Sequence, residues 1–183
     1  MLKHRKDVIV RFVGITFLSV LLLVLSGCQT MKPIHTVDKV DLNRFMGDWY
    51  VIASIPTFIE KDAFNAIESY RLDDDGTVAT TFKFNKGSFD GPLKKYHARG
   101  YVRDKGSNAV WGMQFIWPFK AEYKIIFLSE DYSQTVIGRT KRDYVWIMAR
   151  EKTIPADEYE EILKFLQEQD YNLENISKVP HAP

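Results

Sequence analysis

The stretch Asn43-Arg44-Phe45-Met46-Gly47-Asp48-Trp49-Tyr50 marks the start of the folded domain. Gly47 permits a tight turn into an extended segment, because glycine adopts backbone conformations that are closed to other residues. Trp49 follows two positions later with a wide apolar ring, which can plug the closed end of a barrel. From Asp48 onward the chain has the pattern of successive short strands, so this stretch fixes where the first strand begins.

Eight segments with strand character lie between Asp48 and Arg150. Turn signals separate them, among them Asp73-Asp74-Asp75-Gly76, Asn85-Lys86-Gly87 and Asp104-Lys105-Gly106. The expected strands are 49–55, 64–72, 77–84, 96–103, 109–117, 123–128, 134–139 and 144–150. Eight short strands at regular spacing predict an antiparallel barrel or a sandwich. An eight-stranded barrel is either filled by its own side chains or has room for one small ligand, and composition does not choose between these.

One amphipathic helix is expected after the strands. Pro155 suits its first turn, and acidic residues follow directly, as favours a helix N-terminus. Its apolar face holds residues at helical spacing, namely Tyr159, Ile162, Leu163 and Leu166. Such a face must pack against an apolar surface. The segment 173–179 is consistent with one further strand.

The N-terminal segment has the anatomy of a secretory signal. A basic start precedes an uncharged stretch from Phe12 to Leu25, which is short for a membrane span. The stretch ends at Leu25-Ser26-Gly27-Cys28, which resembles the bacterial lipobox, and Cys28 is the only cysteine. The resemblance implies a signal peptide over 1–27, acyl chains such as palmitate on Cys28, a lipidated tether over 28–37 and a folded domain over 38–183. A plain signal peptide or an uncleaved anchor is the alternative.

Charge and cysteine content limit the remaining classes of function. The formal net charge of the whole chain is +1, and a near-neutral domain is not suited to hold a polyanion, so we expect no nucleic-acid partner. With its single thiol acylated the mature chain would contain no disulfide. The fold must therefore rest on its core, for which 45% apolar and 14% aromatic residues are sufficient.

No recognisable catalytic or metal motif is present. The chain lacks Gly-x-Ser-x-Gly, and His97 is the one histidine within the expected strands. Asp73-Asp74-Asp75-Gly76 lacks the distal glutamate of an EF-hand loop and is interpreted as a turn. We therefore assign no catalytic residue, no metal and no cofactor from the sequence.

Several motifs resemble those of the lipocalin family. Residues 43–50 are similar to its opening Gly-x-Trp motif, and Ser129-Glu130-Asp131-Tyr132 is similar to its second motif. Arg150 stands where lipocalins place a basic residue after the eighth strand. The resemblance covers about residues 38–180. Within the family, segments 117–119, 143–150 and 153–155 look like the bacterial outer-membrane lipocalins, which resemble apolipoprotein D and plant temperature-induced lipocalins.

The resemblance implies an all-β fold, an eight-stranded antiparallel up-and-down barrel with one C-terminal α-helix packed on its outside. It places the barrel floor at Gly47, Trp49 and Arg150 and the second motif at Asp131 and Tyr132. A guanidinium stacked on a desolvated indole contributes about 2 kcal/mol, so these residues have a structural role. Strand parity then predicts inward, ligand-facing side chains at Ala53, Phe82, Phe84, Tyr96, Ala98, Trp111, Met113, Phe115, Tyr123, Ile125, Trp146 and Met148.

The function that the resemblance implies is binding of a hydrophobic ligand, a fatty acid or lysophospholipid, for lipid storage, transport or membrane maintenance. Gln29 rather than aspartate follows the cysteine, which resembles the outer-membrane class of lipoproteins and implies a lipid-anchored, periplasmic-facing protein. A filled barrel that acts through its surface and a lipocalin-fold enzyme acting on a lipid are the alternatives. Four basic residues are candidates for a position near the mouth of the barrel, where they would meet an acidic headgroup: Lys83, Lys94, Lys95 and His97. The alternative interpretation is that they are solvated surface charges with no role in binding.

Overall fold

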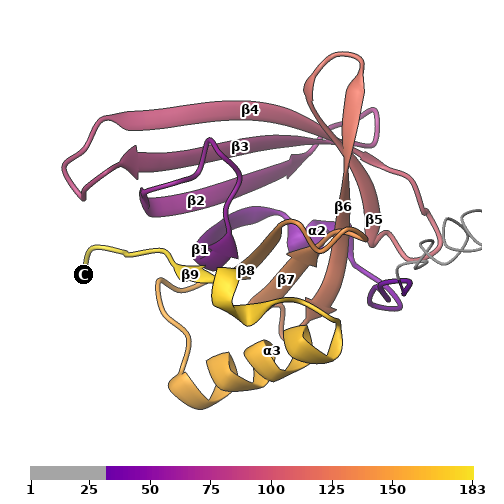
Figure 1. Cartoon of the computed structure of the whole chain (residues 1–183). Helices are drawn as coiled ribbons and strands as arrows, with labels where there is room; N and C mark the ends of the chain where they lie inside the picture. The colour runs from indigo at the N-terminus through magenta and orange to yellow at the C-terminus, as the bar shows by residue number, and fades with distance from the viewer. Residues whose placement is uncertain (1–31) are drawn as a thin grey trace, which may run out of the picture. The chain divides into compact units, whose positions relative to one another are not determined.

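The computed structural model describes residues 32–183, and the predicted signal peptide with the first part of the tether lies outside them. Eight antiparallel strands form the barrel (Figure 1). Their bounds are β1 (Gly47–Ile55), β2 (Ala63–Leu72), β3 (Thr77–Lys86), β4 (Leu93–Val102), β5 (Val110–Ile116), β6 (Phe119–Leu128), β7 (Gln134–Gly138) and β8 (Val145–Ala149). Strand β1 pairs with both β2 and β8, which closes the barrel and confirms the predicted fold class.

Short helices and one more strand complete the domain. Helix α2 (Leu42–Phe45) precedes β1, and helix α3 (Ala156–Glu168) follows β8, as the apolar spacing predicts. The 3₁₀ helix η1 (Leu173–Asn175) leads into β9 (Ser177–Lys178), so the predicted additional strand is only two residues long. Within residues 32–183, no helix combines the length and the apolar character that crossing a membrane would require.

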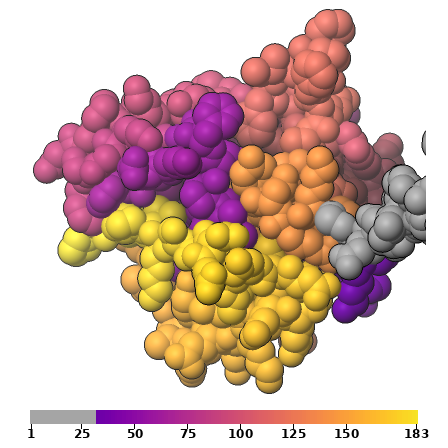
Figure 2. Space-filling model, viewed as in Figure 1, coloured from indigo at the N-terminus to yellow at the C-terminus, as the bar shows by residue number. Residues whose placement is uncertain are grey.

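The β5–β6 hairpin is longer than the sequence pattern predicts. Strand β6 begins at Phe119 instead of residue 123, and only Trp117 and Pro118 separate it from β5. Pro118 directly follows the expected strand 109–117, and in the structure it occupies the turn itself, where it removes no ladder hydrogen bond. The hairpin tip therefore projects from the barrel (Figures 1 and 2).

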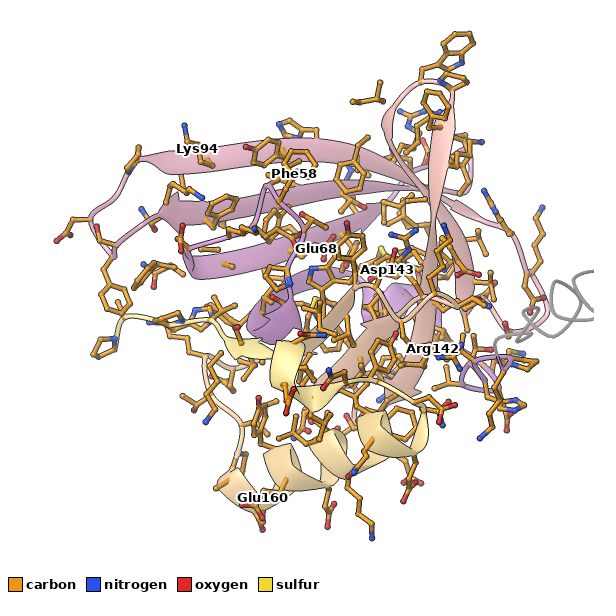
Figure 3. The ribbon with its side chains drawn as sticks, viewed as in Figure 1. Phe58, Glu68, Lys94, Arg142, Asp143 and Glu160 are labelled. Carbon is orange, nitrogen blue, oxygen red and sulfur yellow. The ribbon has the colours of Figure 1, made fainter. Side chains whose placement is uncertain are left out.

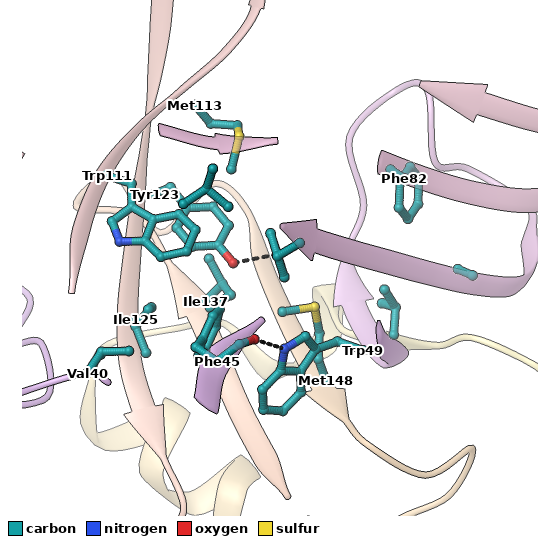
Figure 4. Close-up of a cluster of buried hydrophobic side chains, with 14 of the residues drawn as sticks. Val40, Phe45, Trp49, Phe82, Trp111, Met113, Tyr123, Ile125, Ile137 and Met148 are labelled. Carbon is teal, nitrogen blue, oxygen red and sulfur yellow. Dashed lines mark hydrogen bonds between the residues drawn. The ribbon is translucent and has the colours of Figure 1, made fainter. Parts of the chain in front are cut away.

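The barrel wall separates two apolar clusters. The inner cluster includes the fully buried Phe45, Trp49 and Trp111 (Figure 4). The outer cluster joins Ile162 and Leu166 of α3 to side chains on the outer face of β7 and β8. Each large apolar side chain that is fully buried contributes about 1.5–3 kcal/mol, so α3 is held on the outside of the barrel, as predicted.

A bulge in β1 corrects one predicted side-chain orientation. The register of β1 against β8 shifts between Val51 and Ala53, so the alternation of inward and outward side chains breaks there. Trp49 and Val51 belong to the inner cluster, whereas Ile52 and Ala53 both belong to the outer cluster beneath α3. The prediction that Ala53 faces the barrel interior is therefore wrong.

The C-terminal residues fill a gap in the wall beside β1. Residues 47–50 of β1 pair with β2, but farther along Ala53 and Ser54 pair with β9. Beyond β9, Asn65 of β2 donates its N–H to the carbonyl of Pro180 (2.8 Å), and its side-chain oxygen accepts from the N–H of Ala182 (2.8 Å). The end of the chain thus bridges the two strands where they separate.

Arg150 and Trp49 close one end of the barrel. The guanidinium carbon lies 3.8 Å from the centre of the Trp49 ring. Arg150 also donates to carbonyls around α2, those of Arg44 (2.8 Å), Phe45 (3.2 Å), Met46 (2.9 Å) and Asp48 (2.8 Å).

Gly47 has a φ of +97°, and a Cβ there would lie 3.3 Å from the Arg150 side chain. The positive φ thus favours glycine at this position, and a Cβ there would contact Arg150 closely.

The segment Asp131-Tyr132 also stabilises the closed end of the barrel. Asp131 Oδ1 accepts from the N–H (3.0 Å) and hydroxyl (2.7 Å) of Ser133, which fixes the β6–β7 turn. The Tyr132 hydroxyl accepts from the N–H of Asp41 (2.9 Å), and the Arg44 guanidinium lies 3.9 Å from the Tyr132 ring centre. Both motifs therefore stabilise the closed end and lie away from the opening.

Candidate functional site

A cavity of about 340 Å³ lies inside the barrel and opens opposite the closed end. Its volume is within the range of small-molecule sites. The wall comes from the β1–β2 loop, from β2 to β6, from the turn after β7 and from β8. The lining residues are Thr57, Phe58, Ile59, Glu60, Glu68, Phe82, Tyr96, Met113, Phe115, Ile116, Ala121, Glu122, Tyr123, Arg139, Tyr144 and Trp146.

The predicted inward residues fall into two groups, those that line the cavity and those packed in the inner cluster. Those that line the cavity are Phe82, Tyr96, Met113, Phe115, Tyr123 and Trp146, although Phe115 is 54% exposed and belongs to the opening. A second group is packed into the inner cluster and does not line the cavity, namely Phe84, Trp111, Ile125 and Met148. Ala98 is partly buried against the same cluster. The alternation along a strand predicts whether a side chain points into or out of the barrel, but not where along the barrel axis it lies.

Aromatic side chains form the bottom of the cavity. The Tyr123 ring stacks on Trp111, with ring centres 5.1 Å apart and planes inclined by 14°. Met113 lies next to them (Figure 4). The hydroxyl groups of Tyr123 and Tyr70 are 2.6 Å apart and share a hydrogen bond. The polar atoms of the tyrosines are therefore satisfied by each other, and the surface offered to a ligand is largely apolar.

Two carboxyl groups on one wall were not predicted from the sequence. Glu68 is 9% exposed, and burial raises its pKa to about 7; a hydrogen bond from Tyr70 opposes the rise and nearby Glu60 adds to it. Burial also raises the pKa of Glu60, whose carboxylate accepts from Thr57 N (2.8 Å) and Trp146 Nε1 (3.2 Å). Glu68 shares the inward parity of Tyr70 on β2, and this signal could have identified it.

The other charged lining residues have partners of opposite charge. Glu122 lies 3.0 Å from the Lys124 ammonium, and Arg139 lies 3.5 Å from Asp143. Arg139 is the basic residue on the cavity wall, and its Nε is buried with no hydrogen-bond partner among the described residues.

The other basic candidates lie outside the cavity. None of Lys83, Lys94, Lys95 and His97 lines it. His97 is exposed and lies 3.2 Å from the Thr81 hydroxyl, so it does not face the interior.

Large apolar side chains are exposed at the opening and on the adjoining hairpin tip. Phe58 of the β1–β2 loop is 80% exposed, and Figure 3 labels it beside Glu68. The hairpin tip adds Ile116, Trp117 and Phe119, of which Trp117 is 82% exposed. We call these four side chains the rim. Grouped exposed apolar residues of this size mark an interaction surface in a folded protein.

Comparisons with known proteins agree with this architecture. The model of the lipocalin-like domain family matches residues 40–181. Temperature-induced lipocalin-1 of Arabidopsis thaliana is 26% identical over 160 residues, covering 82% of this chain and 84% of the relative. Outer membrane lipoprotein Blc of Escherichia coli (strain K12) is 28% identical over 142 residues, covering 75% of this chain and 78% of the relative.

Among solved structures, insecticyanin from the tobacco hornworm Manduca sexta superimposes with a TM-score of 0.66 at 13% identity, over 82% of this chain and 86% of that one. At this identity the likeness concerns the fold. The family match spans most of the chain and includes the opening motif, both sides of the closed end and α3. The resemblance read from the motifs is confirmed, and the chain belongs to the lipocalin family.

Proposed function

We propose that this protein binds a single-chain lipid, a fatty acid or lysophospholipid, for lipid storage, transport or membrane maintenance. The observation that carries the proposal is the apolar cavity of about 340 Å³, whose lining includes the exposed rim side chains Phe58 and Ile116. Small-molecule sites are concave and largely apolar with a few polar groups, and this cavity has that composition. A barrel that acts only through its surface would not need such a space.

In the proposed complex the acyl tail enters the barrel and the headgroup stays toward the opening. Each methylene removed from water contributes about 0.8 kcal/mol, from which the cost of immobilising the ligand is subtracted. Arg139 supplies a cation on the wall whose Nε still has a free hydrogen to donate within the described structure. The phosphate of a lysophospholipid headgroup is suited to that position.

Affinity is expected to rise with acyl-chain length and then level off. Each added methylene should tighten binding by up to about fourfold while it enters the cavity, since 0.8 kcal/mol corresponds to that factor. The measurement is calorimetric titration of delipidated protein with fatty acids and lysophospholipids of increasing length. Absence of saturable binding for every chain length, in folded protein, would reject the proposal and favour the filled-barrel alternative.

We propose further that the protein is a lipoprotein of the outer membrane, facing the periplasm. The lipobox-like run ending at Cys28 supports this, as do relatives whose names describe outer membrane lipoproteins. On this proposal residues 1–27 are removed, residues 28–37 connect the acyl chains to the barrel, and two or more acyl chains make the anchor stable.

Replacing Cys28 by serine is expected to abolish lipidation, because serine offers no thiol for the acyl transfer. Cells that express the Cys28→Ser variant in the presence of radiolabelled palmitate should yield unlabelled protein of the unprocessed size. The wild-type chain is the control and should be labelled. Label on the variant would show that the anchor is elsewhere.

Binding rather than catalysis is the proposed activity. The histidine of the barrel strands lies on the outside, and Glu60 accepts hydrogen bonds that hold it in place. A turnover assay over a panel of lipid esters tests the enzymatic alternative. Product formation that disappears in the Glu68→Gln variant would support an enzyme.

A further inference from the structure

The two carboxyl groups on the cavity wall have no opposite charge to balance them. Glu68 is nine-tenths buried and faces the cavity, and Glu60 stands on the same wall close enough to raise the pKa of Glu68. None of the ion pairs among residues 32–183 includes either one. A buried carboxylate without a counter-ion is costly, so a charge supplied by the ligand would relieve that cost.

The remaining charged groups of the cavity cannot supply this balance. Arg139 is engaged with Asp143 at 3.5 Å, and Lys124 is engaged with Glu122 at 3.0 Å. The tyrosines that face the same space, Tyr96, Tyr123 and Tyr144, contribute hydroxyl groups and no positive charge. The wall formed by the β1–β2 loop and β2 therefore presents two carboxyl groups and no basic side chain to whatever occupies the barrel.

We propose that Glu68 and Glu60 form a cation subsite and that the ligand is a single-chain amphiphile with an ammonium group. This inference rests on the proposed function and narrows its ligand class, because it favours a lysophospholipid with an amine over a fatty acid. An ammonium donates up to three hydrogen bonds and neutralises the wall, whereas a carboxylate would add a further negative charge.

Two features prepare this wall for a cation. The indole N–H of Trp146 (3.2 Å) and the backbone N–H of Thr57 (2.8 Å) hold the Glu60 carboxylate in one orientation. The aromatic faces of Trp146, Tyr96 and Tyr123 also line the space, and such faces attract ammonium groups. The subsite is thus preorganised by residues that a purely apolar cavity would not require.

The subsite gives amine binding a defined dependence on pH. With a pKa of about 7, Glu68 is mostly ionised at pH 8.5 and mostly neutral at pH 6. An alkylamine stays protonated at both values, since its pKa resembles that of lysine, about 10.4. Amine affinity should therefore rise with pH, while the affinity of an uncharged alcohol of the same length should not.

The test compares decylamine, decanol and decanoate by calorimetry on delipidated protein at pH 8.5 and pH 6. At pH 8.5 we expect decylamine to bind at least about tenfold more tightly than decanoate. Glu68→Gln, which keeps the shape and removes the charge, should weaken decylamine about tenfold and change decanol less than twofold. Glu60→Gln should act in the same direction. Glu160→Gln makes the same change on the exposed face of α3, outside the barrel, and as the matched control it should leave the amine preference in place.

The outcomes separate this inference from the proposed function. Equal binding of decanoate and decylamine, or an amine preference that survives both glutamine variants, would overturn the cation subsite while leaving lipid binding intact. If none of the three probes binds, the proposed function fails instead. Thermal melting of each variant shows whether it is folded, and Glu60→Gln tests the subsite independently if Glu68→Gln unfolds.

Discussion

The Met113→Arg variant is expected to lose ligand binding by about a hundredfold or more, equivalent to roughly 3 kcal/mol. Met113 lies in the middle of β5, is 3% exposed and forms part of the cavity bottom beside Tyr123. The longer arginine side chain would occupy the space into which a tail must enter. Glu68 and Glu60 share that space and can pair with the new charge, so the variant is expected to fold.

Calorimetric titration with a long-chain lysophospholipid measures this loss, and two variants control it. Met113→Leu conserves the apolar volume and should bind nearly as the wild type does. Gln114→Arg introduces the same charge one residue along β5, on a side chain that bonds Tyr101 and does not line the cavity. Undiminished affinity in folded Met113→Arg would show that the ligand binds elsewhere.

The Arg150→Ala variant is expected to lower the free energy of unfolding by roughly 1–3 kcal/mol. Arg150 donates to the carbonyls of Arg44, Phe45, Met46 and Asp48 and covers the Trp49 ring. Alanine would leave those carbonyls without their donor and expose the indole. A protein of this size should then melt about 2–4 °C lower for each kcal/mol.

Chemical denaturation measures this stability loss, and ligand titration provides the contrast. Arg150→Lys keeps the charge but lacks the planar fork that reaches several carbonyls, so an intermediate loss is expected. Ligand affinity should stay unchanged in both variants at a temperature where they are folded, because Arg150 does not line the cavity. A large loss of affinity with unaltered melting would place Arg150 in the binding site.

Local patterns predict the fold well because each element has its own signal. Alternating apolar residues and Gly- or Asp-rich turns give the eight strands, and the spacing of Ile162 and Leu166 gives the helix and its buried face. Where the prediction misses, a non-local contact decides the outcome. Strand β6 begins at Phe119 because it pairs with Ile116 across the turn, a partnership that the sequence around residue 119 does not encode.

The cavity is harder to predict because depth is a three-dimensional property. Phe82 and Phe84 have the same parity on β3, yet only Phe82 lines the cavity, while Phe84 lies nearer the β3–β4 turn and is buried against Phe82 and Tyr96. The inward orientation predicted for Ala53 is wrong because a one-residue bulge in β1 reverses the alternation of side chains. Glu68 was missed because a buried carboxylate contradicts the usual preference of inward positions for apolar residues.

The way in which the C-terminus fills the gap beside β1 has a consequence for the order in which the protein folds. Strand β1, near the N-terminal end of the domain sequence, must pair with β8 and β9, which lie near its C-terminal end. Such distant pairings make folding slow, typically milliseconds to seconds, and leave strand edges open until they form. Because Pro180 and Ala182 bond to β2, the gap beside β1 stays unfilled until residues 180–182 are available to pack against it. Until these pairings form, the open strand edges favour association between incompletely folded chains.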